Sequence, residues 1–177
     1  MHLQKITSQA SPYWDSLVCI YLRSFPIDEQ RPVADIARLL TEEPRYTMYA
    51  VIDDTSSPLG LLTTWTFDTF TYIEHFALSP EVRGQGYGTE ALQQLIARTT
   101  QPLILEAEPP TDEITHRRIR FYERHGLTLY DYPYLQPAYT ADSQPVALRL
   151  MGLGFAPSSP PLPAVAHTLH REVYGCR

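Results

Sequence analysis

The sequence has only two cysteines, and they do not form a metal-binding or redox motif. Cys19 and Cys176 lie far apart and make no CxxC pair. We therefore expect neither a disulfide framework nor a metal site, and a reducing compartment is favoured. Cys19 lies in an apolar run, which predicts a buried thiol.

Long apolar runs and an excess of basic residues are also missing. No apolar run approaches the roughly 18 residues needed to span a bilayer, and the N-terminus, MHLQKITSQ, lacks the features of a signal peptide. The formal net charge is −6, whereas a nucleic-acid binder normally carries a basic face. We expect a soluble cytoplasmic protein with neither membrane nor nucleic acid as partner. The arginines that do cluster are interpreted as a solvated helix face: Arg117, Arg118, Arg120 and Arg124.

The composition is that of a globular protein. The chain has 177 residues, of which 44% are hydrophobic and 19% charged, enough for one domain with a full core. We assign this domain to residues 1–155 and a proline-rich C-terminal extension to residues 156–177, irregular over 156–163. Val165, Leu169 and Val173 follow a helical spacing and predict a short helix in the extension.

The order of expected elements defines the fold class. Strands are expected at residues 2–7, 46–52, 60–67, 71–78, 103–108, 127–132 and 146–151. Helices are expected from Ser11-Pro12, with Ser11 as N-cap, near 32–40, over 88–99, and from a cap at Thr111 or Asp112 to Gly126. This order predicts an α/β fold with a mixed, mostly antiparallel sheet flanked by helices. The strands between residues 46 and 78 can form an antiparallel meander.

A glycine-rich loop joins an expected strand to an expected helix. From Arg83 to Gly88 it reads Arg-Gly-Gln-Gly-Tyr-Gly. Glycine permits positive φ and has no Cβ, and free N–H groups at a helix N-terminus bind phosphate oxygens. A Walker loop is excluded because Thr89-Glu90 follows, and the spacing differs from the dinucleotide fingerprint. The alternatives left are a site for another phosphate ligand and a tight turn without a ligand.

These residues resemble the GNAT superfamily of N-acetyltransferases. The acyl-CoA signature of that family is Arg or Gln, two residues, Gly, one residue, then Gly or Ala, and Arg83, Gly86 and Gly88 meet it. The segments 76–80, 105–107 and 121–127 (FYERHGL) are similar to the elements around that signature. The resemblance implies a GNAT-like fold and transfer of an acetyl group from acetyl-CoA to a primary amine in a ternary complex.

The resemblance also implies which residues bind acetyl-CoA. The pantetheine arm would pair with the backbone near Phe76, Ala77 and Leu78. The pyrophosphate would bind the N–H groups of the loop residues, which are Arg83, Gly84, Gln85, Gly86, Tyr87, Gly88 and Thr89. One departure is Thr115, which stands where the family often has Asn.

Two roles in acetyl transfer need side chains: an acid for the departing thiolate and a base for the amine. Tyr122 matches the family's acid, with a core aromatic residue as the alternative. Glu106 resembles the carboxylate of members that acetylate protein N-termini, and we slightly prefer it as the base. Glu74 is the second candidate, and either carboxylate could instead pair with an arginine. His75 and His125 are weaker candidates.

Strand alternation predicts the surroundings of the second carboxylate. Glu74 is expected to share a face of its strand with Tyr72 and Phe76, while His75 faces the other way.

The acceptor is not identified by the sequence. Residues 130–134 (YDYPY) correspond to a region that helps to wall the acceptor cleft in the family, and a tyrosine-rich segment packed over the sheet edge is the alternative. Two other functions stay open. One is a non-catalytic acyl-CoA-binding or sensor domain. The other is an interaction module in which the segment from Val165 to Val173 docks on a second subunit, as in a homodimer, although docking on its own domain is the simpler interpretation.

Overall fold

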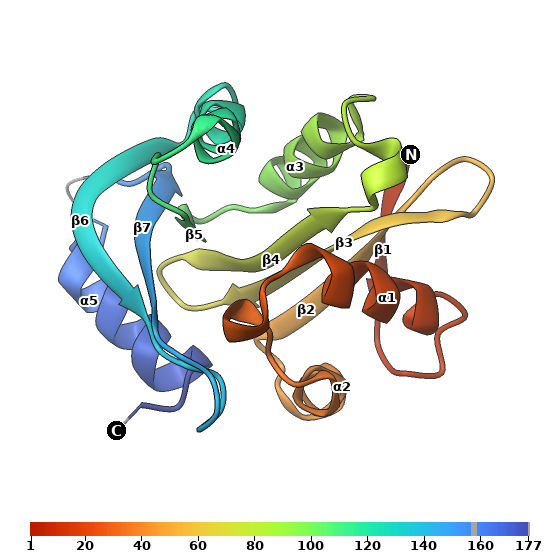
Figure 1. Ribbon diagram of the computed structural model, residues 1–177, viewed down its shortest axis with the longest axis horizontal. Helices are drawn as coiled ribbons and strands as arrows, with labels where there is room; N and C mark the ends of the chain where they lie inside the picture. Colours follow the sequence, from red (N-terminus) through yellow and green to blue (C-terminus); the bar gives the residue numbers. More distant parts are fainter. Residues whose placement is uncertain (157–158, 177) are drawn as a thin grey trace.

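Seven strands form one sheet in the order β1-β2-β3-β4-β5-β7-β6 in this computed structural model, which describes residues 1–156 and 159–176 (Figure 1). Every neighbouring pair is antiparallel except β4 and β5, which are parallel. The mixed, mostly antiparallel sheet and the meander of its second to fourth strands are therefore confirmed. The strands are β1 (His2–Ile6), β2 (Tyr46–Ile52), β3 (Pro58–Thr66), β4 (Thr71–Leu78), β5 (Leu103–Ala107), β6 (Thr128–Gln136) and β7 (Val146–Leu153).

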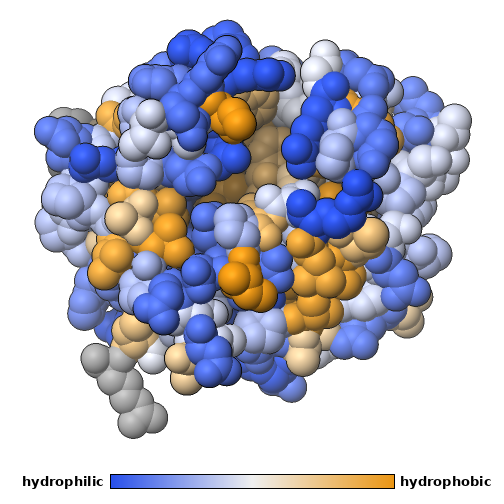
Figure 2. All heavy atoms as spheres, in the orientation of Figure 1, coloured by the Kyte–Doolittle hydropathy of each residue, from blue (hydrophilic) through white to orange (hydrophobic). Residues whose placement is uncertain are grey.

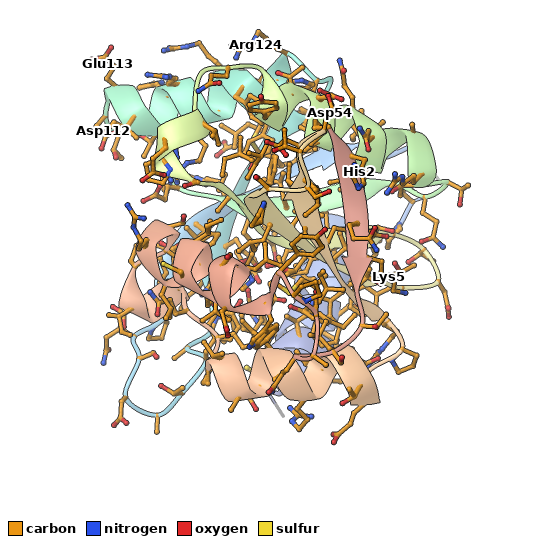
Figure 3. The ribbon with its side chains drawn as sticks, turned by 90° about the vertical axis from the view of Figure 1, so that its right-hand side faces the viewer. His2, Lys5, Asp54, Asp112, Glu113 and Arg124 are labelled. Carbon is orange, nitrogen blue, oxygen red and sulfur yellow. The ribbon has the colours of Figure 1, made fainter. Side chains whose placement is uncertain are left out.

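Helices cover both faces of the sheet. Figure 3 shows α1 and α2 on one face and α3 and α4 on the other. Two core clusters correspond to these faces, one containing Leu17, Ile36 and Leu169, the other Leu92 and Ile119. The elements are α1 (Trp14–Ser24), α2 (Val33–Glu42), α3 (Tyr87–Arg98), α4 (Glu113–Glu123) and α5 (Leu162–Thr168), with the short helical turns η1 (Ile27–Glu29), η2 (Pro80–Val82) and η3 (Leu169–Val173).

The first helix differs from its expected form in two ways. It begins at Trp14 rather than Pro12, because the Ser11 hydroxyl accepts from the N–H of Tyr13 at 3.3 Å and stabilises a turn there instead. Cys19 is exposed rather than buried. The helix turns Trp14 and Leu17 into the core, and the helical period carries Cys19 to the opposite side.

Helix α4 has Asp112 as its N-cap, which is one of the two expected caps. The Asp112 side chain accepts from the N–H of Thr115 at 2.8 Å, and the Thr115 hydroxyl accepts from the N–H of Asp112 at 3.0 Å. This reciprocal pair satisfies two of the free N–H groups at the helix start. Figure 3 shows Asp112 and Glu113 at one end of α4 and Arg124 at the other. Thr115, which replaces the family's Asn, therefore holds the helix start.

The C-terminal segment is part of the main core. Val165 and Leu169 have no exposed surface and Val173 is 4% exposed, all in the cluster that also contains α1 and α2. This face therefore packs on its own domain, which was the simpler interpretation, and the alternative in which it docks on a second subunit is wrong. The irregular segment expected at 156–163 includes residues 157–158, which lie outside the described residues. Within the described ranges, no helix combines the length and apolarity needed to cross a bilayer.

Candidate active site

The parallel strands β4 and β5 separate part of the way along. Their register runs from Thr71 opposite Leu103 to Ile73 opposite Leu105, whereas β4 continues to Leu78. Beyond Ile73, the backbone of β4 has no strand partner on this side among the described residues. The gap therefore exposes backbone N–H and C=O groups inside the sheet.

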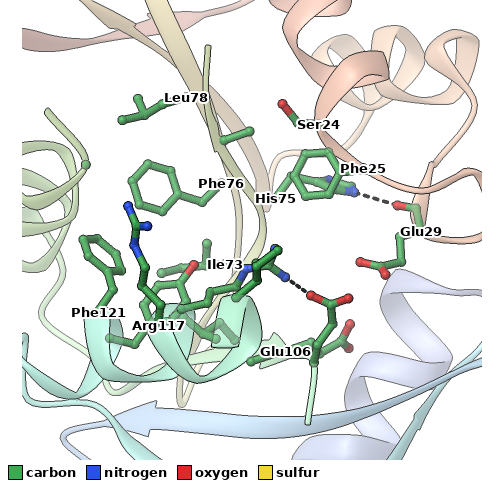
Figure 4. A pocket seen from close by; sticks show the side chains of 18 of the residues that line it. Ser24, Phe25, Glu29, Ile73, His75, Phe76, Leu78, Glu106, Arg117 and Phe121 are labelled. Atoms are coloured by element: carbon green, nitrogen blue, oxygen red, sulfur yellow. Dashed lines mark hydrogen bonds and ion pairs between the residues drawn. The ribbon is translucent and has the colours of Figure 1, made fainter. Parts of the chain in front are cut away.

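A cavity of about 830 Å³ lies at this gap. Figure 2 shows the hollow between the regions of α4 and α3, with apolar side chains on its floor. In the close-up of Figure 4, Phe76, Phe121 and Arg117 lie on one side and Phe25 and Glu29 on the other. The glycine loop and the end of β5 line the same space. One cavity thus connects the glycine loop, the end of β4, Tyr122 and the two candidate carboxylates.

The glycine loop presents a row of free N–H groups. Gly84 and Gly86 have φ of 79° and 91°, a region that other residues rarely adopt. In the described part of the chain, the N–H groups of residues 84–89 have no hydrogen-bond acceptor, and the first N–H bonded within this region is that of Glu90, to the carbonyl of Gly86. Such a row at the start of α3 can hold a phosphate.

Sequence reasoning missed the arginines around this cavity. Arg117, Arg118 and Arg124 line it, although they were interpreted as a solvated face. Arg118 also pairs with Glu108 at the end of β5. Helical spacing could have identified two of them, because Arg117 and Arg124 lie four residues before and three after Phe121, on its face of α4. They give the cavity a basic side that can bind phosphates.

Tyr122 reaches the cavity from α4. Its side chain is 8% exposed and packs in the core cluster that contains Ile119. Burial raises the pKa of Tyr122 to about 12, against the opposing charge of Arg118. The phenol therefore stays protonated at neutral pH and can donate a proton or a hydrogen bond.

Glu106 reaches the cavity from β5. Its Oε2 accepts a hydrogen bond of 2.8 Å from the Tyr174 hydroxyl. Its Oε1 is buried and has no partner among the described residues. Burial raises the pKa of Glu106 to about 7, although the hydroxyls of Tyr134, Tyr174 and Tyr72 act in the opposite direction. A carboxylate with this pKa can accept a proton near neutral pH.

Glu74 is held in a buried ion pair instead. Its Oε1 accepts from Nε and Nη2 of Arg31 at 2.9 and 2.7 Å and from the Tyr139 hydroxyl at 3.0 Å. Its Oε2 accepts from the indole N–H of Trp65 at 2.9 Å. Burial disfavours the charge, but Arg31, His75 and Trp65 outweigh burial and hold the pKa of Glu74 below its usual value. The arginine-pair alternative therefore describes Glu74, and Glu106 is the better candidate for the base.

A β-bulge changes the alternation expected around Glu74. Glu74 contacts Trp65 in the cluster that contains Tyr72, as expected, but the expected sides of His75 and Phe76 are wrong. The β3–β4 register shifts between Thr63 and Thr64, which leaves Glu74 as an extra residue. Glu74 and His75 consequently point to the same side, with His75 Nδ1 3.8 Å from Glu74 Oε2. Phe76 points to the other side and packs in the other core cluster.

The two histidines have structural contacts. His75 is buried, which lowers its pKa, and its Nδ1 and Nε2 lie 3.3 Å from the Thr63 hydroxyl and 3.4 Å from the Tyr21 hydroxyl. His125 Nδ1 lies 2.8 Å from the carbonyl oxygen of Phe121 at the end of α4. Among the described residues, no three His, Cys, Asp or Glu side chains form a metal-binding group.

The acceptor side of the cavity is formed by residues after the expected stretch 130–134. No residue of that stretch lines the cavity, although it belongs to the same strand β6 as Gln136, which lines the cavity together with Tyr139. Gln136 is 4% exposed, and its amide nitrogen has no hydrogen-bond partner in the described ranges. This buried amide can contact a polar group of a ligand.

Removing Arg31 should destabilise the protein strongly. We expect Arg31→Met to lower the free energy of unfolding by about 3–5 kcal/mol, because the buried Glu74 carboxylate loses its charged partner. Urea unfolding followed by circular dichroism measures the change. Arg38→Met, which breaks an exposed pair with Asp35, serves as the control and should cost less than about 1 kcal/mol. Equal losses for the two variants would contradict the prediction.

Comparison with known proteins agrees with this geometry. Residues 14–127 match the profile of the Acetyltransferase (GNAT) family. YjbC of Bacillus subtilis (strain 168), which is provisionally named an acetyltransferase, is 32% identical over 102 residues. The match covers 56% of this chain and 50% of YjbC, so it spans half the length of that curated relative.

Solved structures extend the similarity to the whole chain. A protein from Bacteroides thetaiotaomicron that is provisionally assigned to the GNAT family is 33% identical, with a TM-score of 0.92 and complete coverage of both chains. A GNAT family acetyltransferase from Elizabethkingia anophelis with acetyl-CoA bound is 13% identical, with a TM-score of 0.59 over 87% of this chain and 97% of that one. At that identity the similarity is one of fold.

Proposed function

Because the chain belongs to the GNAT family of acetyltransferases, we propose that it transfers the acetyl group of acetyl-CoA directly to a primary amine. The observation that carries the proposal is the single cavity that joins the glycine loop, the open edge of β4, Tyr122 and Glu106. Donor and acceptor can meet in this space, and their proximity lowers the barrier to reaction.

The donor is proposed to bind along the glycine loop and β4. The free N–H groups of residues 84–89 would hold the pyrophosphate. Residues 76–78 pair with β3 on one side, and their edge that faces the gap would bond the pantetheine amides, as a neighbouring strand would. Arg117 and Arg124 would contribute positive charge for the remaining phosphate. The Elizabethkingia anophelis protein, which has the same fold, has acetyl-CoA bound, and this supports acetyl-CoA as the donor.

Glu106 is proposed to act as the general base and Tyr122 as the general acid. Glu106 takes a proton from the acceptor ammonium, directly or through a water molecule. The amine nitrogen then forms a bond with the acetyl carbon, the carbon–sulfur bond breaks, and the nitrogen releases its second proton to water as the amide forms. Tyr122 donates to the departing thiolate. The two side chains approach the gap from opposite faces of the sheet, since Tyr122 belongs to the cluster under α4 and Glu106 contacts Tyr174 of the other face.

The acceptor is proposed to be a cationic amine. Phe25 and Tyr139 place aromatic rings on the acceptor side, and Glu29 adds a half-buried carboxyl group. Burial raises the pKa of Glu29, and the neighbouring Glu108 raises it further. Carboxylates and aromatic faces both attract ammonium groups.

Calorimetric titration with acetyl-CoA tests the proposal, with NAD as the control ligand. We expect micromolar binding of acetyl-CoA and none of NAD. An amine screen that detects released CoA thiol then tests transfer. If neither acetyl-CoA nor CoA binds, the proposal loses its main support. Binding without transfer to any amine would favour the non-catalytic acyl-CoA-binding domain.

Replacing Gly86 should weaken acetyl-CoA binding about tenfold. Alanine at φ of 91° costs about 1–2 kcal/mol, so the loop will relax and turn its N–H groups away from the phosphates. Gly154→Ala is the matched control, because Gly154 has a similar φ of 77° and does not line the cavity. Calorimetry should show the loss for Gly86→Ala only, and an unchanged affinity would show that the loop does not bind the donor.

A further inference from the structure

We propose that Tyr174, which directly follows the C-terminal turn η3, is a positioning residue for Glu106. Its hydroxyl holds one carboxylate oxygen in place and leaves the other free to take the proton from the acceptor. This inference rests on the proposed function, in which Glu106 is the base. The residue lies outside the part of the chain that matches the family profile, residues 14–127.

The hydrogen bonds around Tyr174 have a defined direction. The hydroxyl of Tyr174 donates to Glu106 Oε2 at 2.8 Å, and the hydroxyl of Tyr72 lies 3.1 Å from that of Tyr174. A phenol has a single proton, so Tyr174 gives its proton to the carboxylate and accepts from Tyr72. Each bond in such a chain strengthens the next. The carboxylate is thereby fixed by Oε2, and Oε1 remains without a partner in the described ranges.

The residues before Tyr174 fix its position. The carbonyl oxygen of Val173 accepts from Nη2 of Arg31 at 2.9 Å, the same guanidinium that pairs with Glu74. Glu172 pairs with Arg45 at 2.8 Å. The ring centroid of Tyr174 lies 5.0 Å from that of Tyr139, which lines the cavity. Tyr174 is therefore held from several sides, as positioning another residue requires.

The pKa of Glu106 provides a measurable test of this role, because the direction of its change can be predicted. The groups that face Glu106 are the hydroxyls of Tyr72, Tyr134 and Tyr174 and the carboxylate of Glu74. Burial raises the pKa of Glu106, the three hydroxyls lower it, and Glu74 raises it. A hydroxyl that donates to the ionised carboxylate stabilises that form. Removing the Tyr174 hydroxyl must therefore raise the pKa of Glu106.

Tyr174→Phe removes the hydroxyl and keeps the ring. We expect it to raise the pKa of Glu106 by about one unit, because a hydrogen bond to a charged group is lost. The acid limb of the pH profile of kcat/KM should move upward by the same amount. The pKa is read without substrate from the carboxyl ¹³C signal of protein labelled at glutamate, and the signal is assigned by its loss in Glu106→Gln.

Two further variants serve as a control and as a second test. Tyr49→Phe removes a hydroxyl from β2, away from the cavity, and should move neither the pKa nor the profile. Tyr72→Phe removes the more distant bond of the chain and should raise the pKa of Glu106 by less than Tyr174→Phe does. It also replaces Tyr174→Phe as the test if circular dichroism shows that this variant is unfolded.

The outcomes separate this inference from the proposed function. An unchanged pKa of Glu106 in folded Tyr174→Phe overturns the inference, even if the wild type acetylates amines. An upward shift that appears in both the signal and the rate profile supports it. If the wild type transfers acetyl to no amine, the proposed function fails, and the carboxyl signal alone still decides whether Tyr174 controls Glu106.

Discussion

Replacing Tyr122 by phenylalanine is expected to lower kcat by about 10²–10⁴-fold, the usual loss when a general acid is removed. The affinity for acetyl-CoA should change little, because the ring stays and only the hydroxyl is removed. The effect follows from the place of Tyr122, which lines the cavity from α4 and is kept protonated by burial. The thiolate would then leave without a proton donor.

Single-turnover kinetics and calorimetry separate the two quantities. The first gives the rate of acetyl transfer and the second the dissociation constant for acetyl-CoA. Tyr49→Phe is the matched control and should retain the wild-type rate. Wild-type turnover by Tyr122→Phe on the true acceptor would remove this residue from the mechanism and leave it as a core aromatic.

Replacing Glu106 by glutamine is expected to lower kcat/KM by about 10²–10⁴-fold at pH 7. In the wild type the rate should rise with pH and level off above about 7, because the unprotonated carboxylate accepts the proton and its pKa is raised by burial to about 7. Glutamine cannot titrate, so this acid limb should disappear. Rates measured from pH 5 to 9 test both statements.

Glu74→Gln is expected to differ from Glu106→Gln in both stability and pH profile. Glu74 is ionised and paired with Arg31, so its loss should reduce stability and leave Arg31 as an unpaired buried charge. Glu106 differs, because its folded-state pKa lies above that of an ordinary glutamate. Ionisation of Glu106 therefore disfavours the folded state above about pH 7, and Glu106→Gln should keep or raise stability there. If Glu74→Gln folds normally and loses the acid limb, the two assignments must be exchanged.

Local sequence patterns were sufficient for most of the fold. The strand from Thr71 to Leu78 was expected with its observed bounds, because a run of aromatic and β-branched residues is a local signal. The cap at Asp112 and the helical spacing of Val165 and Leu169 are also local, and both are confirmed. The loop from Arg83 to Thr89 has the backbone that a phosphate site needs, and its ligand stays a prediction.

The surroundings of the two carboxylates could not be predicted from local sequence patterns. The β-bulge opposite Thr63 and Thr64 reverses the side on which His75 lies. A single inserted residue cannot be recognised from the alternation of polar and apolar residues in the sequence. Tyr174 contacts Glu106 across 68 positions of the chain. Partners at such a distance in sequence are determined by the packing of the whole molecule. An arginine partner for Glu74 was therefore an open alternative without being identified as Arg31, and the tyrosine partner of Glu106 was not expected.

The separation of β4 and β5 leaves the sheet incomplete, because one side of β4 has no neighbouring strand beyond Ile73 among residues 1–156 and 159–176. A donor that bonds this edge as proposed would act as the missing strand, and it would bind the folded chain alone. The free energy of unfolding would then grow with the supply of acetyl-CoA, by about 2.7 kcal/mol at a hundred times the dissociation constant. The persistence of the protein in a cell would therefore follow the metabolic supply of its own substrate.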